Sequence, residues 1–461
     1  MCTIFNTTSL IGHLQRPIKV FLLLILIRGV PELQAQYDRF AESYDLLTTV
    51  AGKGETDDRT KPEWLPEFEN GPAVEAELTR PHFAMADSMG NIFIADKDAH
   101  GIRKVNTEGI ISTVAGTNIA GDNGDGPGTE HQLSNPNGLW VKPDGTVYIL
   151  DLGNNKVRKL DTGGNMTTVF HDENGISLGR GIWVTPGEDT VFYSSATLIK
   201  MWTAEGGIQS YSTGYSGLGN ICMDKNGFLV ATDRPANLVY RISKAGNTKE
   251  IIAGNGTVSG GGDGSLATET GLSGVRGVWF LEDNSYFVAT HEGSQIWYID
   301  VLGTIHLFLN GREGDEYHSG DGENYTTPGY KISEARSVSV DHQGNVLVVE
   351  NDMGFVRKIE NEYIYYYTGL INRNIENQET YAFPNPATYG TTVHFFLDRP
   401  GEIRINLYDP RGQELLTLTR VYPDAGNKEI YIKTTGLNSG VYFYSLRSAR
   451  FEQTDKLIII D

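Results

Sequence analysis

The chain has 461 residues, of which 54 are glycine, and its 38 basic and 58 acidic side chains give a formal net charge of −20. This acidic balance argues against a nucleic-acid partner, because phosphate binding needs clustered lysine and arginine. The many glycines favour short strands joined by tight turns and few long helices.

The N-terminus has the pattern of an export signal. Arg16 and Lys19 precede an apolar run, and the sequence LQAQ offers a cleavage site after Ala35. The apolar run is too short to cross a bilayer. We therefore expect residues 1–35 to be a signal peptide and the mature chain to have no transmembrane segment. Because Cys2 would be removed and Cys222 is the only other cysteine, an internal disulfide is excluded.

One short pattern then recurs six times along the chain. Two apolar residues flank two variable or basic ones in IRKV, VRKL, IKMW, VYRI, IWYI and VRKI, which begin at residues 102, 157, 199, 239, 296 and 356. Two strand-like segments precede each copy and one follows it. This periodicity predicts six units of four antiparallel strands between Leu78 and about Gly369.

The second unit, NPNGLWVKPDGTVYILDLGNNKVRKLDTGGNMTTVF, resembles an NHL repeat. The third unit departs most, since TVFYSSATLIKMW lacks the Asp-Thr-Gly-Asn turn of that family. The resemblance implies an all-β fold, a closed six-bladed β-propeller over residues 44–369. The strand-like residues 46–52 match a fourth strand, so we expect them to clasp the last blade or to lie beside it. Residues 363–369, YIYYYTG, compete for the same position.

After a linker at residues 370–380, a different pattern of alternating apolar and polar positions begins at Tyr381. Its landmarks are Pro384, Asn385, Pro386, Gly412, Gly440 and Tyr442. The segment resembles the C-terminal sorting domain of the type IX (Por) secretion system of Bacteroidota. The resemblance implies a small β-sandwich over residues 381–461, recognition by the type IX machinery, and release or anchoring at the outer-membrane surface. An ordinary accessory sandwich is the alternative.

In an up-and-down blade, the start of the first strand and the end of the second share one edge, so two rings of residues should line one face of the propeller. The first ring is His82, Asn137, Arg180, Gly219, Arg276 and Arg336. The second ring is Asp96, Asp151, Ser195, Asp233, His291 or Thr290, and Glu350.

The arginines of the first ring are the sharpest functional feature of the sequence. A guanidinium fork suits carboxylate, sulfate or phosphate. We therefore expect Arg180, Arg276 and Arg336, with His82 and Asn137, to line a channel mouth that binds an anionic ligand. The alternative is that each arginine is neutralised by an acidic residue of the second ring.

The acidic residues of the second ring have two interpretations of their own. Asp96, Asp151, Asp233 and Glu350 provide oxygen ligands for Ca²⁺ or Zn²⁺ if they converge on one ion. Otherwise they accept hydrogen bonds from turn amides, as aspartate readily does. No cofactor is certain from the sequence.

The classical signatures of catalysis are missing. The chain has no G-x-S-x-G, H-E-x-x-H or C-x-x-C motif. The sequence favours a secreted or surface-attached binding propeller that holds a glycan, a peptide or an envelope protein. The alternative is an extracellular metal-dependent lyase or hydrolase on the same face.

Two further features remain. Trp140, Trp183 and Trp279 occupy equivalent positions in three units and are expected to pack between blades, with sugar stacking as the alternative. The glycine-aspartate loop AGDNGDGPGTEHQLSNPNGLWV, residues 120–141, is expected to be a connector between blades, with an ion site as the alternative.

Overall fold

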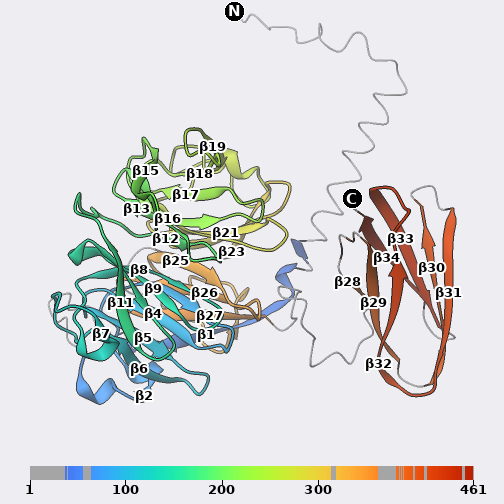
Figure 1. Cartoon of the computed structure of the whole chain (residues 1–461), viewed down its shortest axis with the longest axis horizontal. Helices are drawn as coiled ribbons and strands as arrows, with labels where there is room; N and C mark the ends of the chain where they lie inside the picture. The colour runs from blue at the N-terminus through green and yellow to red at the C-terminus, as the bar shows by residue number, and fades with distance from the viewer. Residues whose placement is uncertain are drawn as a thin grey trace, which may run out of the picture. The chain divides into compact units, whose positions relative to one another are not determined.

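The computed structural model describes residues 37–461 except 39, 55–63, 313–317, 362–380, 384, 386, 388, 398–399, 410–412, 449–451 and 460–461. The chain divides into two compact units, Met1–Tyr367 and Thr368–Asp461 (Figure 1). Strands dominate both units, in agreement with the predicted all-β class. No helix in the described ranges is long and apolar enough to cross a membrane. The predicted signal peptide and linker lie outside the described residues.

Within the described residues, the strands of the first unit form six antiparallel sheets. From the innermost strand outward, the first three sheets are β3 (Pro81–Ala86), β4 (Ile92–Asp96), β5 (Gly101–Val105) and β6 (Ile110–Ala115); β8 (Pro136–Val141), β9 (Val147–Asp151), β10 (Lys156–Leu160) and β11 (Asn165–His171); and β12 (Ile182–Val184), β13 (Thr190–Ser195), β14 (Leu198–Thr203) and β15 (Gly207–Thr213). The next three are β16 (Leu218–Met223), β17 (Leu229–Asp233), β18 (Leu238–Ile242) and β19 (Lys249–Ala253); β20 (Val275–Phe280), β21 (Tyr286–Thr290), β22 (Gln295–Ile299) and β23 (Ile305–Leu309); and β25 (Ala335–Val340), β26 (Val346–Glu350), β27 (Phe355–Asn361) and β1 (Tyr44–Ala51).

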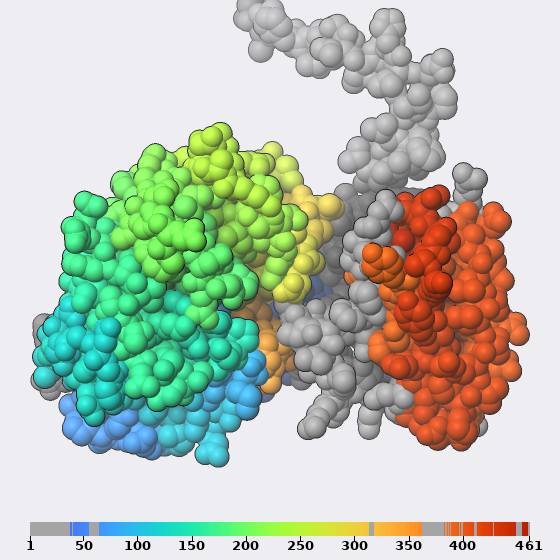
Figure 2. Space-filling view, viewed as in Figure 1, coloured from blue at the N-terminus to red at the C-terminus, as the bar shows by residue number. Residues whose placement is uncertain are grey.

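The six sheets close into a ring. The innermost strands contact one another in chain order from β3 to β25, and β25 in turn contacts β3. The colours of Figure 2 run in the same order around this unit. Apolar clusters fill the spaces between neighbouring sheets: Ile94 of β4 and Val349 of β26, for example, are buried in one cluster between the first and last sheets. This arrangement is the β-propeller that the repeats predict.

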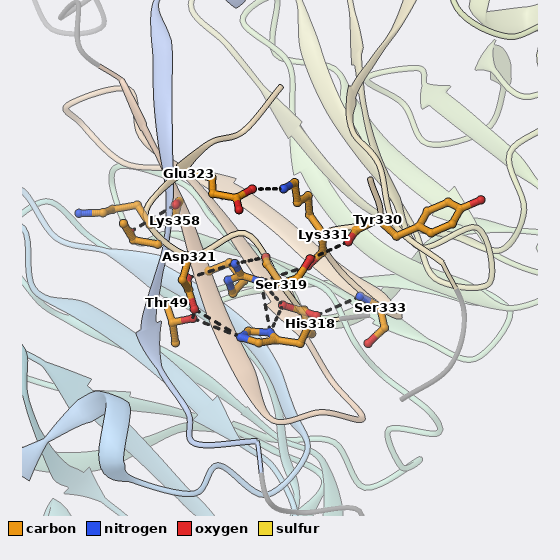
Figure 3. A network of polar contacts seen from close by, with 12 residues as sticks. Thr49, His318, Ser319, Asp321, Glu323, Tyr330, Lys331, Ser333 and Lys358 are labelled. Atoms are coloured by element: carbon orange, nitrogen blue, oxygen red, sulfur yellow. Dashed lines mark hydrogen bonds and ion pairs between the residues drawn. The ribbon is translucent and has the colours of Figure 1, made fainter. Parts of the chain in front are cut away.

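The N-terminal strand completes the last sheet. Strand β1 pairs antiparallel with β27, with buried Leu47 opposite Ile359. A polar network crosses this seam (Figure 3), in which Thr49 donates to the Asp321 carboxylate at 2.7 Å and Arg357 donates to Asp321 at 3.1 Å. The first and last segments of the propeller are thus joined in one sheet. Residues 363–369, which compete for this position in the sequence, lie outside the described residues.

The glycine-aspartate loop of residues 120–141 is a connector. Its short strand β7 (Gly126–Pro127) pairs with β11 and covers the outer edge of that sheet, which removes an exposed edge. The Asp125 carboxylate accepts hydrogen bonds from the Thr168 N–H at 3.0 Å and from Arg158 at 3.0 Å. The carboxylate therefore fastens the loop to the sheet that follows it. β2 (Gly71–Pro72) and β24 (Glu323–Asn324) cover β6 and β1 in the same way.

The second unit is a two-sheet sandwich. One sheet has the order β28 (Tyr381–Phe383), β29 (Gly390–Leu397) and β32 (Gly426–Lys433), and the other has the order β31 (Glu414–Tyr422), β30 (Gly401–Tyr408), β33 (Gly440–Arg447) and β34 (Glu452–Ile459). One buried apolar cluster joins residues of both sheets, among them Val393 and Leu457.

Two of the predicted sorting landmarks tie this sandwich together. Asn385 accepts a hydrogen bond from the Ile458 N–H at 2.7 Å and donates to the Lys456 carbonyl at 2.8 Å. Tyr442 is buried in the core and donates to the Asn438 carbonyl. Gly440 begins β33. Pro384, Pro386 and Gly412 lie outside the described residues.

Candidate functional site

Four innermost strands begin with the same irregularity. Pro81 lies opposite Asp96 and Phe83 lies opposite Ala95, so His82 is an extra residue with no partner across the ladder. The equivalent extra residues of the other three strands are Asn137, Arg276 and Arg336. Such a β-bulge turns a side chain away from its regular direction and is common beside functional sites. Four of the five predicted ligand-binding residues therefore occupy bulges.

The structure brings all five predicted residues together in one pocket of about 470 Å³, which we call the arginine pocket. They also line a smaller inner cavity of about 10 Å³. The residues that line the arginine pocket are Arg80, His82, Lys97, Asn135, Asn137, Leu152, Gly153, Leu178, Arg180, Arg276 and Arg336. Five of these side chains are basic and none is acidic, although the whole chain carries a net charge of −20.

Sequence reasoning missed two kinds of lining residue. Arg80 and Lys97 lie just before β3 and just after β4, outside the two predicted rings. In the fourth sheet, Asn220 lines the inner cavity in place of the predicted Gly219. A β-carbon on Gly219 would lie 2.6 Å from the Arg276 carbonyl oxygen, so glycine there allows β16 and β20 to approach closely. The strand-spacing rule gave the correct neighbourhood but was one residue off at this bulge.

The three arginines differ in how they are held. Arg336 contacts the Nε2 atoms of His82 and His291 at 3.1 and 3.0 Å. Arg180 donates to the Leu218 carbonyl at 3.0 Å. The Nε and Nη1 atoms of Arg276 are buried and have no hydrogen-bond partner in the described part of the chain, and its side chain forms no ion pair there. None of the three is neutralised by an acidic residue of the second ring.

Burial and mutual repulsion lower the pKa values of the basic groups in this site. Burial, reinforced by Arg336 and Arg180, lowers the pKa of Arg276 to about 8. Burial also lowers the pKa of Arg336 to about 9. Burial and the nearby arginines lower the pKa of His82 well below its usual value and that of His291 to about 2. At neutral pH the histidines are therefore uncharged acceptors, while the arginines carry their charge.

The acidic residues of the second ring, which we call the acidic ring, are each hydrogen-bonded within their own sheet. Asp96 accepts the Thr79 N–H at 2.7 Å, and Asp151 accepts the Ser134 N–H at 2.7 Å. The corresponding donors are the Ser216 N–H at 2.8 Å for Asp233 and the Ser333 N–H at 2.9 Å for Glu350. Each carboxylate thus fastens the loop that leads into the innermost strand of its sheet.

A second set of arginines neutralises three of these carboxylates. Arg103, Arg158 and Arg357 come from the repeated third-strand pattern, and each side chain is fully buried. They lie 3.0, 3.6 and 3.1 Å from the carboxylates of Asp96, Asp151 and Glu350. The repeated Arg in IRKV, VRKL and VRKI therefore has a structural role that the sequence pattern alone did not reveal.

The four predicted metal ligands lie in four different sheets. In the described ranges, the group with the spacing of a metal site is instead His291, Glu334 and Asp352, whose ligand atoms lie within 4.8 Å of one another. Arg336 contacts His291 at 3.0 Å, and Arg80 lies 3.8 Å from Asp352. These positive charges oppose the binding of a cation. A Ca²⁺ or Zn²⁺ ion bound by these four carboxylates remains the alternative interpretation.

The three tryptophans meet one another. The ring centroids of Trp140 and Trp183 are 3.9 Å apart, and those of Trp140 and Trp279 are 6.0 Å apart. Since β8 and β20 are on opposite sides of the ring of sheets, the latter contact spans the propeller axis. The tryptophans also pack against the apolar clusters between sheets, as predicted. They fill the axis near the far ends of the innermost strands.

Comparison with known proteins supports both units. Residues 381–460 match the family model of the secretion system C-terminal sorting domain. A protein of unknown function from Bacteroides thetaiotaomicron has a similar structure, with a TM-score of 0.53 and 13% identity over 68% of this chain and 75% of that chain. An auxiliary nutrient binding protein from Bacteroides ovatus has a TM-score of 0.52 and 14% identity over 69% of this chain and 77% of that chain. At these identities the likeness concerns the fold alone.

Two curated relatives match a short part of the sequence. Teneurin-3 of Danio rerio is 36% identical over 85 residues, or 15% of this chain and 3% of that protein. Teneurin-3 of Mus musculus is 34% identical over 100 residues, or 19% of this chain and 4% of that protein. The chain therefore covers only a small fraction of the length of these relatives. Taken with the sheets and the matched tail, the chain is a β-propeller protein that carries a secretion system C-terminal sorting domain.

Proposed function

We propose that this protein is exported through the type IX secretion machinery and acts outside the cell as a binding propeller that holds an anionic ligand in the arginine pocket. The sorting domain at residues 381–460 supports the export step and a secreted or surface-attached location. The name of the Bacteroides ovatus relative, an auxiliary nutrient binding protein, is consistent with a binding role for this fold.

The burial of Arg276 without a full set of hydrogen-bond partners is the main observation behind the proposal. The residue is only 5% exposed, and two of its three guanidinium nitrogens lack a hydrogen-bond partner among the described residues. An unpaired buried charge costs several kcal/mol, so proteins rarely keep one without a functional reason. An anion that enters the pocket would restore the missing hydrogen bonds and neutralise the repulsion among the arginines.

Binding of simple and polymeric anions to the full chain tests the proposal. Isothermal titration with sulfate, galacturonate oligomers and carboxylate peptides should find at least one binder. Replacing Arg276 and Arg336 together with methionine should abolish its binding. Lys225→Gln is the matched control, because this exposed lysine pairs with Glu282 in turns at the opposite ends of the strands. A binder held as tightly by the double variant as by the native chain would overturn the proposal.

A further inference from the structure

We propose that the ligand of the arginine pocket is the free C-terminal carboxylate of a peptide with an apolar last residue, inserted end-on. This inference rests on the proposed anion-binding function and specifies its ligand. It depends on the shape of the pocket, on two unpaired buried groups, and on the side chains of the outer rim.

The shape of the pocket selects the end of a chain. The inner cavity of about 10 Å³ has room for one small group, while the pocket outside it measures about 470 Å³. A cavity of this inner size accommodates roughly one water-sized group. A terminal carboxylate can reach such a cavity while the rest of the ligand stays outside. The main chain of an internal polymer segment cannot.

The donors around the cavity match a carboxylate. Arg180, Arg276 and Arg336 all line the inner cavity, and the guanidinium of Arg276 has donors that no described residue accepts. A planar guanidinium binds a carboxylate through two parallel hydrogen bonds. Arg336 is held in place by His82 and His291, so it supplies positive charge without having to move.

An unpaired acceptor indicates what lies beside the carboxylate. The Asn137 side chain donates its amide N–H to the Gly179 carbonyl, which fixes the orientation of the amide. Its Oδ1 atom is then left buried and without a partner in the described residues. The ligand therefore needs an N–H or O–H donor next to its carboxylate. The N–H of the last residue of a peptide is such a donor, whereas sulfate has none.

The outer rim favours a peptide over an acidic sugar. Sugars are commonly held against the face of a tryptophan, tyrosine or phenylalanine ring, and none of these residues lines the arginine pocket. Two leucines line it instead, Leu152 and Leu178, and Leu178 is 60% exposed. An exposed leucine at the mouth offers an apolar contact to the last side chain of a peptide.

Isothermal titration of the full chain with N-acetyl-Ala-Ala-Leu and its C-terminal carboxamide tests the inference. The free acid should bind, and the carboxamide should bind about 100-fold more weakly, because a buried cation then lacks its counter-charge. A variant of the peptide that is N-methylated at the last residue should bind about tenfold more weakly, because it cannot donate to Asn137.

Protein variants assign the contacts. Arg276→Met should lose most of the affinity for the free acid, and Arg276→Lys should retain part of it, because lysine keeps the charge without the fork. Asn137→Leu should abolish the discrimination against the N-methylated peptide. Lys225→Gln should bind every peptide as the native chain does. The melting temperature of each variant shows that it is folded, and Arg276→Lys provides a second reading if Arg276→Met does not fold.

The outcomes separate this inference from the proposed function. Equal binding of acid and carboxamide overturns the inference. Binding of galacturonate or sulfate, lost in Arg276→Met, with no binding of the peptide acid also overturns it but leaves the proposed function intact. If none of these anions binds, both are overturned.

Discussion

The Nε atom of Arg103 donates to the Asp96 carboxylate at 3.0 Å, and both side chains are fully buried. Because Asp96 also accepts the Thr79 N–H, this pair connects the third strand of the first sheet to the loop that leads into its innermost strand. We therefore interpret the acidic ring as a support for the arginine pocket.

Removal of one partner of this pair is the first prediction. Arg103→Met should lower the free energy of unfolding by about 3–5 kcal/mol, because it leaves a buried carboxylate unpaired. The double variant Arg103→Met with Asp96→Asn should lose less than the sum of the two single variants. Urea unfolding of the four proteins checks this, and strict additivity would show that the two side chains do not interact.

In the arginine pocket, by contrast, the loss of an arginine should stabilise the fold. Arg276→Met should raise the free energy of unfolding by about 1–3 kcal/mol, because it removes a buried charge of which two nitrogens have no hydrogen-bond partner in the described residues. Calorimetry in a buffer without multivalent anions should therefore show a higher melting temperature than for the native chain. A lower melting temperature would mean that Arg276 stabilises the fold.

The stability of the seam between β1 and β27 should depend on pH. Burial alone would lower the pKa of His318, but its contacts with Asp321 and Glu350 raise it above the usual value. A raised folded-state pKa stabilises the fold fully below the unfolded pKa of about 6.5, and this contribution is lost as pH rises through the folded pKa. We expect this contribution to decrease over the pH interval that begins at about 6.5 and extends above it.

Comparison with His318→Gln isolates this effect. The difference in unfolding free energy between the native chain and the variant should shrink as pH rises over that interval. Subtraction is needed because Asp151, whose pKa burial raises to about 6, titrates nearby in pH. A difference that does not depend on pH would exclude His318 as the titrating group.

Metal removal tests the metal-dependent alternative. The melting temperature should be the same in EDTA, in calcium and in zinc, because Asp96, Asp151, Asp233 and Glu350 are already engaged by backbone N–H groups. Differential scanning fluorimetry checks this. A rise of several degrees with one ion, reversed by EDTA and lost in Asp233→Asn, would restore the metal site and with it the lyase or hydrolase hypothesis.

The sorting domain should be needed for export. A chain that ends at residue 380 should stay inside the outer membrane, because it lacks the matched region 381–460. Asn385→Ala should reduce export, since Asn385 makes two hydrogen bonds to the last strand. Quantitative immunoblots of cell and culture fractions measure both. Normal export of the truncated chain would contradict the prediction.

The local pattern of the sequence was enough to predict the repeats, the sorting domain and the face where the site lies. Alternation of apolar residues with period two identifies strands, and the turn residues between them determine the antiparallel order. The two rings, among them His82, Asn137, Arg276 and Arg336, followed from that order alone. These features depend on residues close together in the chain, which is why they could be read without a structure.

Only the tertiary structure decided which charges meet. Asp96 has Arg103 seven residues away as its partner, while Arg336 has His82 as a neighbour 254 residues away across the closed ring. The sequence alone did not indicate whether Arg103 or Arg336 would pair with a carboxylate of the acidic ring. A β-bulge at Arg336 turned its side chain towards the pocket, whereas regular pairing with β4 placed Arg103 opposite Ile94, on the same face of the sheet as Asp96. Closure of the ring then left two guanidinium nitrogens of Arg276 buried without a hydrogen-bond partner among the described residues, because pairing of charges is set by three-dimensional proximity rather than by residue type.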